Sequence, residues 1–391
     1  MTRVLLAFDK FKDSLTAQRA CETTAAALRA VHPEWVVTQA PLADGGEGFA
    51  EILTESAGGQ LLSEKVSGPR GEVLSAEYGL VPVKAIPEAA RHQLQLPAQV
   101  SPEDKVAVIE MARASGLALL SSAARDPWQT TSRGTGELMR AALRRGAVAI
   151  LLGVGGSATH DLGLGALTQL GYDFHTRDDA IVDPPIPAHW ESIVRVSGSA
   201  LPGMPPVFIA CDVTNPLLGT RGAAAVYGPQ KGLRAEDHPA LEKQSERLAR
   251  LLCLHAGKPT KVMSTPGAGA AGGIAFGLMA GVDAKLLPGF ELVSAWLDLE
   301  AKLAAADLVI TGEGRFDESS LEGKGPGAVA ARALQLGKPV HIFAGQVTAA
   351  NRPHLELHAI TPAHALLAQA LREAPDNLGA TVRRIFSTPH F

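Results

Sequence analysis

A glycine-rich segment, LLGVGGSATHDLGLGAL at residues 151–167, places the strongest constraint on how this chain can fold. It continues the apolar run AVAILL, which is typical of a buried strand, and it leads into an expected helix from about Asp161. Glycine lets a backbone turn sharply and approach another group closely, and the N–H groups of such a turn can bind an anion. The candidate binding positions in this turn are Gly153, Gly155, Gly156, Ser157 and Thr159. A plain turn in which Asp161 caps the helix is the alternative interpretation.

Comparable loops recur where other apolar runs end. They occupy residues 41–48, 210–219, 265–273 and 311–327. Expected strands such as RVLLAF at 3–8 and WVVTQ at 35–39 alternate with expected helices, one of them capped by Ser14 or Thr16 and running to about Val31. This alternation predicts an α/β fold with a largely parallel sheet. Loops at the strand ends then line a shared crevice, which is where open α/β sheets bind ligands.

The length of 391 residues predicts two domains. Residues 1–65 and 290–391 show clean strand–helix alternation, whereas residues 66–289 contain proline-rich inserts and more irregular strands. We therefore expect a discontinuous domain, 1–65 with 290–391, into which a second domain, 66–289, is inserted.

Composition excludes several classes of function. The net charge is -4 and no basic stripe is present, so we expect no nucleic-acid partner and no anionic membrane partner. No apolar run reaches transmembrane length, and the six apolar residues before Asp9 are too few for a signal peptide. Cys21, Cys211 and Cys253 form no CxxC pair, which favours reduced thiols and a cytoplasmic location.

Acids fall in the glycine-rich loops, and bases fall in these and in other loops. The acids are Asp44, Glu47, Asp161, Asp212, Glu313 and Asp317, and the bases are Lys10, Lys12, Arg133, Arg221, Lys231, Arg315 and Lys324. Carboxylates are the ligands that Mg²⁺ takes when it accompanies a phosphate-rich ligand. The combination predicts a site for a nucleotide, a metal ion and an anionic substrate, although any one of these residues could be an ordinary surface charge.

Two other classes of function stay open at this point. GVGGSA at 153–158 and GAGAAG at 267–272 match the dinucleotide pattern, and Asp178 or Asp179 lies about 20 residues beyond the first, so a nicotinamide-dependent dehydrogenase is one alternative. The other is a non-catalytic nucleotide sensor, which would explain the glycines but not the number of acids. No Walker A sequence occurs, which argues against a P-loop kinase.

Taken together, the loops resemble the bacterial glycerate kinase family. The matching segments are FKDSL (11–15), PLADGGEG (41–48), IEMARASGL (109–117), TTSRGTGELMRAAL (130–143), GVGGSATHDLGLG (153–165), ACDVTNPLLG (210–219), YGPQKG (227–232), PGAGAAGG (266–273) and VITGEGRFD (309–317). They stand in the family's order and span nearly the whole chain. Two positions depart from the family's usual pattern, because FDKFK replaces a Pro-Asp-Ser-like turn and His160 stands where asparagine is usual.

The resemblance implies two three-layer α/β domains, one Rossmann-like (1–65 with 290–391) and one flavodoxin-like (66–289), with the active site in the cleft between them. It also implies ATP, Mg²⁺ and D-glycerate, with 2-phosphoglycerate as the expected product and phosphorylation at the 3-hydroxyl as the alternative.

Individual roles follow from chemistry and loop position within that family. We expect Asp161, Asp212, Lys12 and Arg133 to be catalytic, with Asp212 and Glu313 as metal ligands. Substrate contacts are expected from Asp44, Glu313, Asp317 and Lys324, and nucleotide contacts from Gly153, Gly155, Gly156, Ser157, Thr159, Gly267, Gly269 and Gly272.

Overall fold

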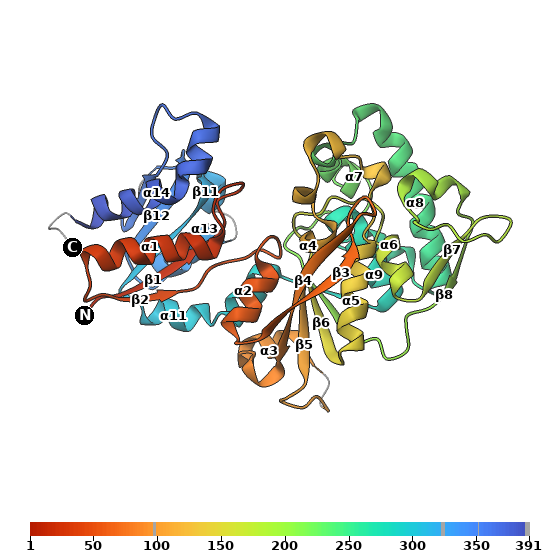
Figure 1. The fold of residues 1–391 in the computed structure, drawn as a ribbon, viewed down its shortest axis with the longest axis horizontal. Helices are drawn as coiled ribbons and strands as arrows, with labels where there is room; N and C mark the ends of the chain where they lie inside the picture. The colour runs from red at the N-terminus through yellow and green to blue at the C-terminus, as the bar shows by residue number, and fades with distance from the viewer. Residues whose placement is uncertain (97–98, 322–324, 351, 388–391) are drawn as a thin grey trace. The chain divides into compact units, whose positions relative to one another are not determined.

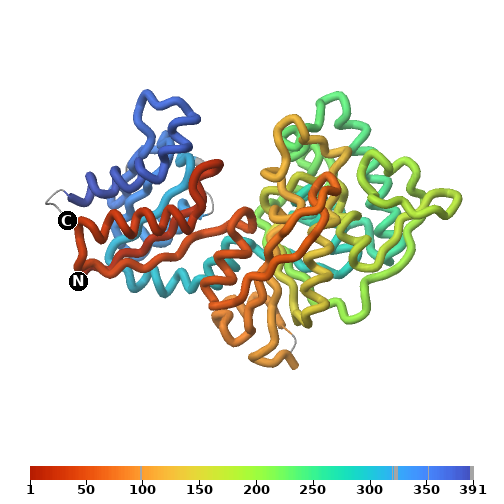
Figure 2. Tube along the Cα trace, viewed as in Figure 1, coloured from red at the N-terminus to blue at the C-terminus, as the bar shows by residue number. Residues whose placement is uncertain are grey.

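The chain forms two compact units in the computed structural model, which describes residues 1–391 except 97–98, 322–324, 351 and 388–391 (Figure 1). Unit 1 consists of residues 1–44 and 293–391, and unit 2 consists of residues 45–292. The red and blue ends of the chain therefore belong to the same unit (Figure 2). Helix α10 (Gly289–Trp296) contains the second boundary.

The first boundary lies at residue 44, not at residue 65 as predicted. Residues 45–65 belong to unit 2 because β3 (Gln60–Ser67) pairs along its whole length with β4 (Val73–Pro82). Helix α2 (Phe49–Ser56) packs against β4 and β5 (Lys105–Glu110) of the same unit. The loose alternation after residue 60 therefore marks an antiparallel edge of a sheet and not a junction between domains.

Unit 1 is built on a five-stranded parallel sheet with the order β13-β12-β11-β1-β2. Its strands are β1 (Arg3–Phe8), β2 (Val36–Gln39), β11 (Leu308–Phe316), β12 (Val340–Val347) and β13 (Leu355–Ala359). Numbered within the unit, the order is 2-1-3-4-5, which is the flavodoxin-like order. The flavodoxin-like topology therefore belongs to the outer part of the chain, whereas the sequence analysis placed it in the inserted part.

Helices cover both faces of this sheet. The helices of unit 1 are α1 (Ala17–Val31), α11 (Leu299–Ala305), α12 (Glu318–Leu321), α13 (Pro326–Gln335) and α14 (Leu367–Phe386). α1 and α14 bury Leu28 and Leu378 against Leu6 and Phe343 on one face, while α11 and α13 pack against β1 and β11. Thr16 caps α1 by accepting a hydrogen bond from the N–H of Arg19, as predicted.

Unit 2 contains a six-stranded mixed sheet with the order β10-β9-β6-β5-β4-β3. The further strands are β6 (Ala147–Gly153), β9 (Val207–Ala210) and β10 (Lys285–Leu287), and β7 (Tyr172–His175) pairs with β8 (Arg195–Gly198) in a separate hairpin. Strands β5, β6, β9 and β10 are parallel, so their carboxyl ends meet at one edge. All the glycine-rich loops of this unit lie at that edge or pack against it.

The helices of unit 2 enclose its sheet. They are α2, α3 (Glu88–Leu94), α4 (Ala112–Ser115), α5 (Arg133–Arg144), α6 (Leu164–Gln169), α7 (Ala223–Tyr227), α8 (His238–His255) and α9 (Ala270–Val282). The larger core joins Ile109, Ile150 and Ile209 of the sheet to Leu138 of α5 and Ile274 of α9. The predicted α/β class is thus confirmed in both units.

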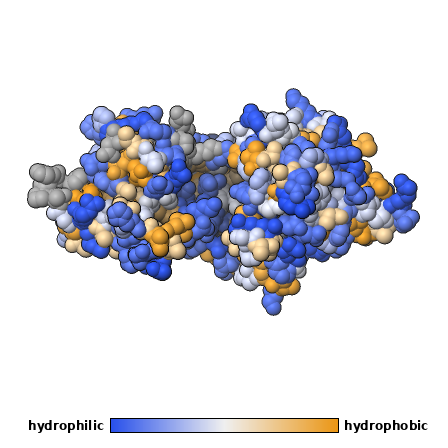
Figure 3. All heavy atoms as spheres, turned by 90° about the horizontal axis from the view of Figure 1, so that it is seen from above, coloured by the Kyte–Doolittle hydropathy of each residue, from blue (hydrophilic) through white to orange (hydrophobic). Residues whose placement is uncertain are grey.

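The surface is mainly hydrophilic on the face that Figure 3 shows. Hydrophobic side chains form small, separate areas on this face. Within the described residues, no helix combines the length and apolar character that a membrane span requires.

Candidate functional site

The carboxyl ends of β1 and β11 form the topological switch point of unit 1. The two strands are neighbours, but β1 is followed along the chain by β2 on one side and β11 by β12 on the other. Sheets of this kind bind ligands outside such a point because the connecting segments diverge and leave a crevice. Asp9 directly follows β1, and its N–H donates to the carbonyl of Gly312 at 3.0 Å. Glu313 is the next residue of β11, three residues before that strand ends at Phe316, so the two carboxylates lie on adjacent strands beside the end of β1.

Both carboxylates at the switch point resist ionisation. Burial raises the pKa of Asp9 to about 6, with Lys10 opposing and Asp44 adding to the shift. Burial also raises the pKa of Glu313 to about 7; a hydrogen bond with Ser320 opposes the shift, and the charges of Asp9 and Asp317 increase it. Crowded, partly desolvated carboxylates are costly without a cation, and they occur preferentially at functional sites.

Further polar side chains of unit 1 lie near these two acids. The Nζ atom of Lys10 lies 3.2 Å from Asp44 and 3.8 Å from Asp9. Asp317 and Ser320 exchange two hydrogen bonds, at 3.2 and 3.3 Å, in the loop after β11. The structure therefore brings the predicted Asp44, Glu313 and Asp317 together with Asp9 and Lys10. Lys10 was noted from the sequence only as a loop base, and Asp9 was not among the predicted site residues.

Lys12 is exposed in the short loop after β1. The loop closes through two hydrogen bonds between Phe11 and Leu15, at 2.8 and 3.0 Å. The predicted substrate contact Lys324 lies outside the described residues.

The glycine-rich loops of unit 2 pack against one another. A Cβ atom on Gly153 would lie 2.5 Å from the carbonyl oxygen of Gly45, and one on Gly155 would lie 2.5 Å from the Cα of Gly46. The N–H of Gly155 donates to Gly45 at 2.9 Å. These glycines are therefore needed for contact between two loops of the protein, whereas the sequence analysis assigned their close approach to a nucleotide.

The second glycine series is used in the same way. A Cβ atom on Gly272 would overlap the carbonyl group of Thr159, and one on Gly269 would overlap that of Pro216. Gly267 has φ +92° and packs near Cys211. Gly156 differs from the other predicted glycines because it is exposed, with φ +71°. It is the predicted glycine best placed to approach a ligand.

A buried lysine holds the loop at residues 157–159. Lys231 is only 1% exposed, and its Nζ atom donates to Ser157 Oγ at 2.8 Å and to the carbonyl of Thr159 at 2.7 Å. Burial lowers the pKa of Lys231 to about 7, with Asp161 opposing the shift. Ser157 and Thr159, which the sequence predicted to bind the nucleotide, therefore accept hydrogen bonds from the buried ammonium group of Lys231.

His160, next to this loop, is also internal. Its Nε2 atom lies 3.2 Å from Ser245 Oγ, and burial lowers its pKa to about 3. A buried imidazole with so low a pKa is a weak base and is out of reach of a substrate, so a structural role fits His160 better than that of a general base.

Asp161 is fully buried, and its carboxylate is saturated with donors. Oδ2 accepts from the N–H and Oγ of Ser132, at 2.7 and 2.8 Å, and from the N–H of Gly165 at 3.2 Å. Oδ1 accepts from Gly163 at 3.2 Å. Burial raises its pKa, and the four hydrogen bonds oppose the shift. In this conformation Asp161 holds the start of α6 through Gly163 and Gly165, which agrees with the capping alternative. None of its surface is open to a ligand.

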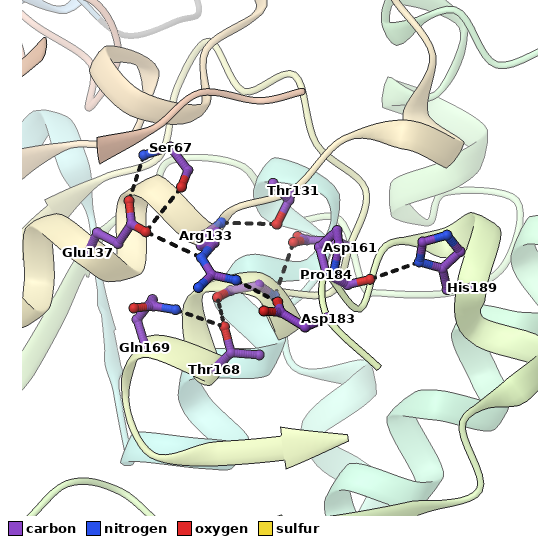
Figure 4. Close-up of polar contacts among 11 residues, drawn as sticks. Ser67, Thr131, Arg133, Glu137, Asp161, Thr168, Gln169, Asp183, Pro184 and His189 are labelled. Atoms are coloured by element: carbon purple, nitrogen blue, oxygen red, sulfur yellow. Dashed lines mark hydrogen bonds and ion pairs between the residues drawn. The ribbon is translucent and has the colours of Figure 1, made fainter. Parts of the chain in front are cut away.

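Arg133 is also engaged inside unit 2 (Figure 4). Its guanidinium pairs with Asp183 and with Glu137, whose Oε1 lies 3.3 Å from Nε, and Glu137 also binds Ser67. Asp183 is the main cause of the raised pKa of Arg133. Two carboxylates of the protein thus balance the charge of Arg133, which the sequence predicted to be catalytic.

Asp212 follows β9 and accepts from the N–H groups of Gly289 and Phe290, at 3.0 and 2.9 Å. It therefore caps the start of α10 and is half-buried. A carboxylate has lone pairs beyond these two bonds, so its predicted role as a metal ligand stays a prediction.

Glu110 is a candidate that the sequence analysis did not single out. It ends β5 in register with Gly153, is 1% exposed, and accepts from the N–H of Gly48 at 3.0 Å. Burial raises its pKa to about 7, with Arg113, 3.8 Å away, opposing the shift. The signal that could have found Glu110 and Asp9 is the same: each is an acid at the end of an apolar parallel strand. No comparable signal marks Lys231 as a buried lysine.

Comparison with known proteins agrees with the resemblance. Residues 4–389 match the model of the glycerate kinase family. The chain is 39% identical to a glycerate kinase of Halalkalibacterium halodurans, over 89% of this chain and 86% of that protein. It is 35% identical to glycerate 2-kinase of Escherichia coli K12, over 99% and 97%. A crystal structure assigned to glycerate kinase 2 of Salmonella typhimurium LT2 superimposes with a TM-score of 0.78 at 37% identity, covering 99% and 97% of the two chains.

Replacing Glu110 by glutamine should remove a pH-dependent cost of folding. The folded-state pKa of about 7 lies above the ordinary glutamate pKa of 4.5, so the native state binds more protons between these pH values. The unfolding free energy of the wild type should therefore fall, relative to that of Glu110→Gln, by on the order of 3 kcal/mol between pH 4.5 and pH 7. Denaturant unfolding at a series of pH values measures the difference. Glu77→Gln, at an exposed residue of β4, is the control, and parallel curves for Glu110→Gln and wild type would contradict the prediction.

Replacing Asp161 by asparagine should destabilise unit 2. The new amide group would face N–H and O–H donors that now share a carboxylate, which should lower the unfolding free energy by about 2–4 kcal/mol. Denaturant unfolding tests this, with Asp173→Asn on an exposed strand position as the control. Unchanged stability together with a roughly 100-fold lower kcat would instead support the catalytic role that the sequence suggested.

Proposed function

The chain belongs to the glycerate kinase family, and we propose that it transfers the γ-phosphoryl group of ATP to the 2-hydroxyl group of D-glycerate. The products would be 2-phosphoglycerate and ADP. The observation that carries the proposal to particular residues is the pair of carboxylates, Asp9 and Glu313, at the switch point of unit 1. Phosphoryl transfer needs charge neutralisation and positioning more than covalent chemistry, and this position in the fold suits both.

The donor set at the switch point fits Mg²⁺. Asp9, Glu313 and Asp317 offer only oxygen atoms, and one or two carboxylates are what this ion takes when phosphates supply further ligands. The electrostatics favour a cation: burial raises the pKa of Asp9 and Glu313, the charge of Asp44 adds to the shift at Asp9, and the charges of Asp9 and Asp317 add to the shift at Glu313. A divalent cation would offset these effects. Bound there, Mg²⁺ would supply neutralisation of the phosphate charge.

Residues of unit 1 would then orient the anionic substrate. Lys10 is already tied to Asp44 and Asp9, so it keeps the acids at the switch point in place. Lys12 is exposed two residues further along and is the cation of this loop that we assign to the glycerate carboxylate or the migrating phosphoryl group. The loss of one such contact in the transition state would lower kcat more than it raised KM.

The loop assembly of unit 2 would contribute rigidity and polar groups. Exposed Gly156, and half-buried Asp212, lie at the ends of β6 and β9, the places where an α/β sheet presents backbone N–H groups to phosphates. Asp161, Lys231 and Glu110 would act by holding these loops and not by touching the substrate.

Phosphorylation of the 2-hydroxyl is favoured over the 3-hydroxyl by the Escherichia coli relative, which is a glycerate 2-kinase and aligns with almost the whole chain. Membership of the family also argues against a nicotinamide-dependent dehydrogenase and a nucleotide sensor. The contacts of Gly153 and Gly272 with other loops explain why these glycines resemble a dinucleotide pattern.

Purified protein should convert D-glycerate and ATP to 2-phosphoglycerate, and EDTA should abolish turnover. The test is ³¹P NMR of the products formed from D-glycerate, with L-glycerate as the matched control substrate. Formation of 3-phosphoglycerate alone would overturn the regiochemistry. Turnover that persists without a divalent ion would overturn the assignment of Mg²⁺.

Asp9→Asn and Glu313→Gln should each lower kcat/KM by roughly 100-fold and raise the Mg²⁺ concentration needed for half-maximal activity. The reason is that each change removes a negative charge from the set assigned to the cation. Asp307→Asn is the control. Asp307 lies directly before the amino end of β11, the strand that contains Glu313, and it is paired with Arg3. Wild-type activity with an unchanged Mg²⁺ requirement in both variants would show that these acids do not serve the metal.

A further inference from the structure

Three side chains on β12 and β13 of unit 1 present potential metal ligands to one another. His341 pairs in register with Glu356, and His358 follows Glu356 by two residues on the same face of the sheet. Nδ1 of His341 lies 2.9 Å from Nε2 of His358, and Oε2 of Glu356 lies 3.9 Å from each nitrogen. Among the residues that the structure describes, this is the group of three or more His, Cys, Asp or Glu side chains with ligand atoms within 4.8 Å of one another.

The cluster is separate from the switch-point acids. His341 is the second residue of β12, whereas Ala344, three residues later, is the partner of Glu313. The imidazoles instead contact the aromatic side chains of Phe343 and Phe386, the latter at the end of α14. The proposed kinase reaction therefore makes no use of these histidines.

Both imidazoles are in the state that binds metals. Burial lowers the pKa of His341 and that of His358 to about 4, so both rings are neutral at neutral pH. Arg384 adds to the shift at His358, and Glu356 opposes it. Neutral imidazole with a free lone pair is the common nitrogen ligand of Zn²⁺, and a glutamate completes sets of the His₂Glu type.

We propose that His341, His358 and Glu356 bind one Zn²⁺ ion, or a similar divalent ion that prefers imidazole, and thereby fasten the edge strand β13 to β12. The ion would replace the hydrogen bond between the rings, whose proton would move to the other nitrogen of the donating ring, and water would complete a tetrahedron. Two nitrogen ligands of one tetrahedral zinc lie roughly 3.4 Å apart when each Zn–N bond is about 2.1 Å. The rings need to separate by about half an ångström, and Oε2 of the exposed Glu356, now 3.9 Å from each nitrogen, needs to approach by a similar amount.

The site is structural and not catalytic. β13 is an edge strand and is hydrogen-bonded to one neighbour only, β12. A metal crosslink to β12 would therefore stabilise a strand that has fewer backbone partners than the central strands. An ion that binds the native state and not the unfolded chain raises the unfolding free energy by mass action. The proposal does not depend on the proposed function.

The test is titration of the chelator-treated full-length protein with ZnCl₂, followed by isothermal calorimetry and by thermal unfolding. Excess Mg²⁺ is present throughout to occupy the carboxylates at the switch point, and Cys211→Ser serves as the background so that its half-buried thiol cannot bind zinc. One saturable equivalent and a higher Tm are expected. His358→Gln and Glu356→Gln should each weaken zinc binding by about 10-fold or more, since even the loss of a supporting residue around a metal costs that much.

His364→Gln, at an exposed histidine after β13, is the matched control and should bind zinc like the background. Glu356→Gln keeps the test decisive if His358→Gln fails to fold, because the Glu356 side chain is 56% exposed. Absence of a saturable equivalent, or equal zinc affinity in Glu356→Gln and the background, would overturn the proposal. The histidines would then be a hydrogen-bonded pair only.

Discussion

The carbonyl group of Thr159 is the point on which the loop assembly of unit 2 depends. It accepts a hydrogen bond from the buried ammonium group of Lys231, and it lies so close to Gly272 that no side chain fits there. The first contact fixes the loop after β6, and the second brings the start of α9 against it. Because protein interiors are close-packed, a methyl group at Gly272 could be accommodated only by moving one of these loops.

The same assembly carries an electrostatic cost. Lys231, Asp161 and Glu110 are all buried, and burial opposes the charged form of each. Hydrogen bonds offset part of the cost at Asp161, which has four donors, whereas at Glu110 the backbone N–H groups of Ala50 and Gly48 and the nearby Arg113 do so. A fold selected for stability alone has little reason to keep such groups, and functional sites are where they accumulate.

The two proposals place their residues in different parts of unit 1. Asp9 follows β1 and Glu313 lies in the second half of β11, and in the proposed function a substrate-bound cation would neutralise both. The histidines of β12 and β13 lie on the face covered by α14, near the side chain of Phe386. The proposed phosphoryl transfer and the proposed zinc crosslink use different residues of the same parallel sheet, so the two can coexist.

The sequence by itself determined the α/β class, the approximate strands and the family, because apolar periodicity and short ordered motifs are local properties. It also placed Asp44 and Asp317 in loops that follow strands, whereas Glu313, expected in a loop, lies inside β11, which extends to Phe316. The tertiary structure decided what those loops touch. Gly153 and Gly272 contact other loops, Asp161 is enclosed by its own donors, and Lys231 is internal, because each of these facts depends on residues distant in the chain. The register of β12 and β13 that aligns His341 with Glu356 is likewise set only when the sheet forms.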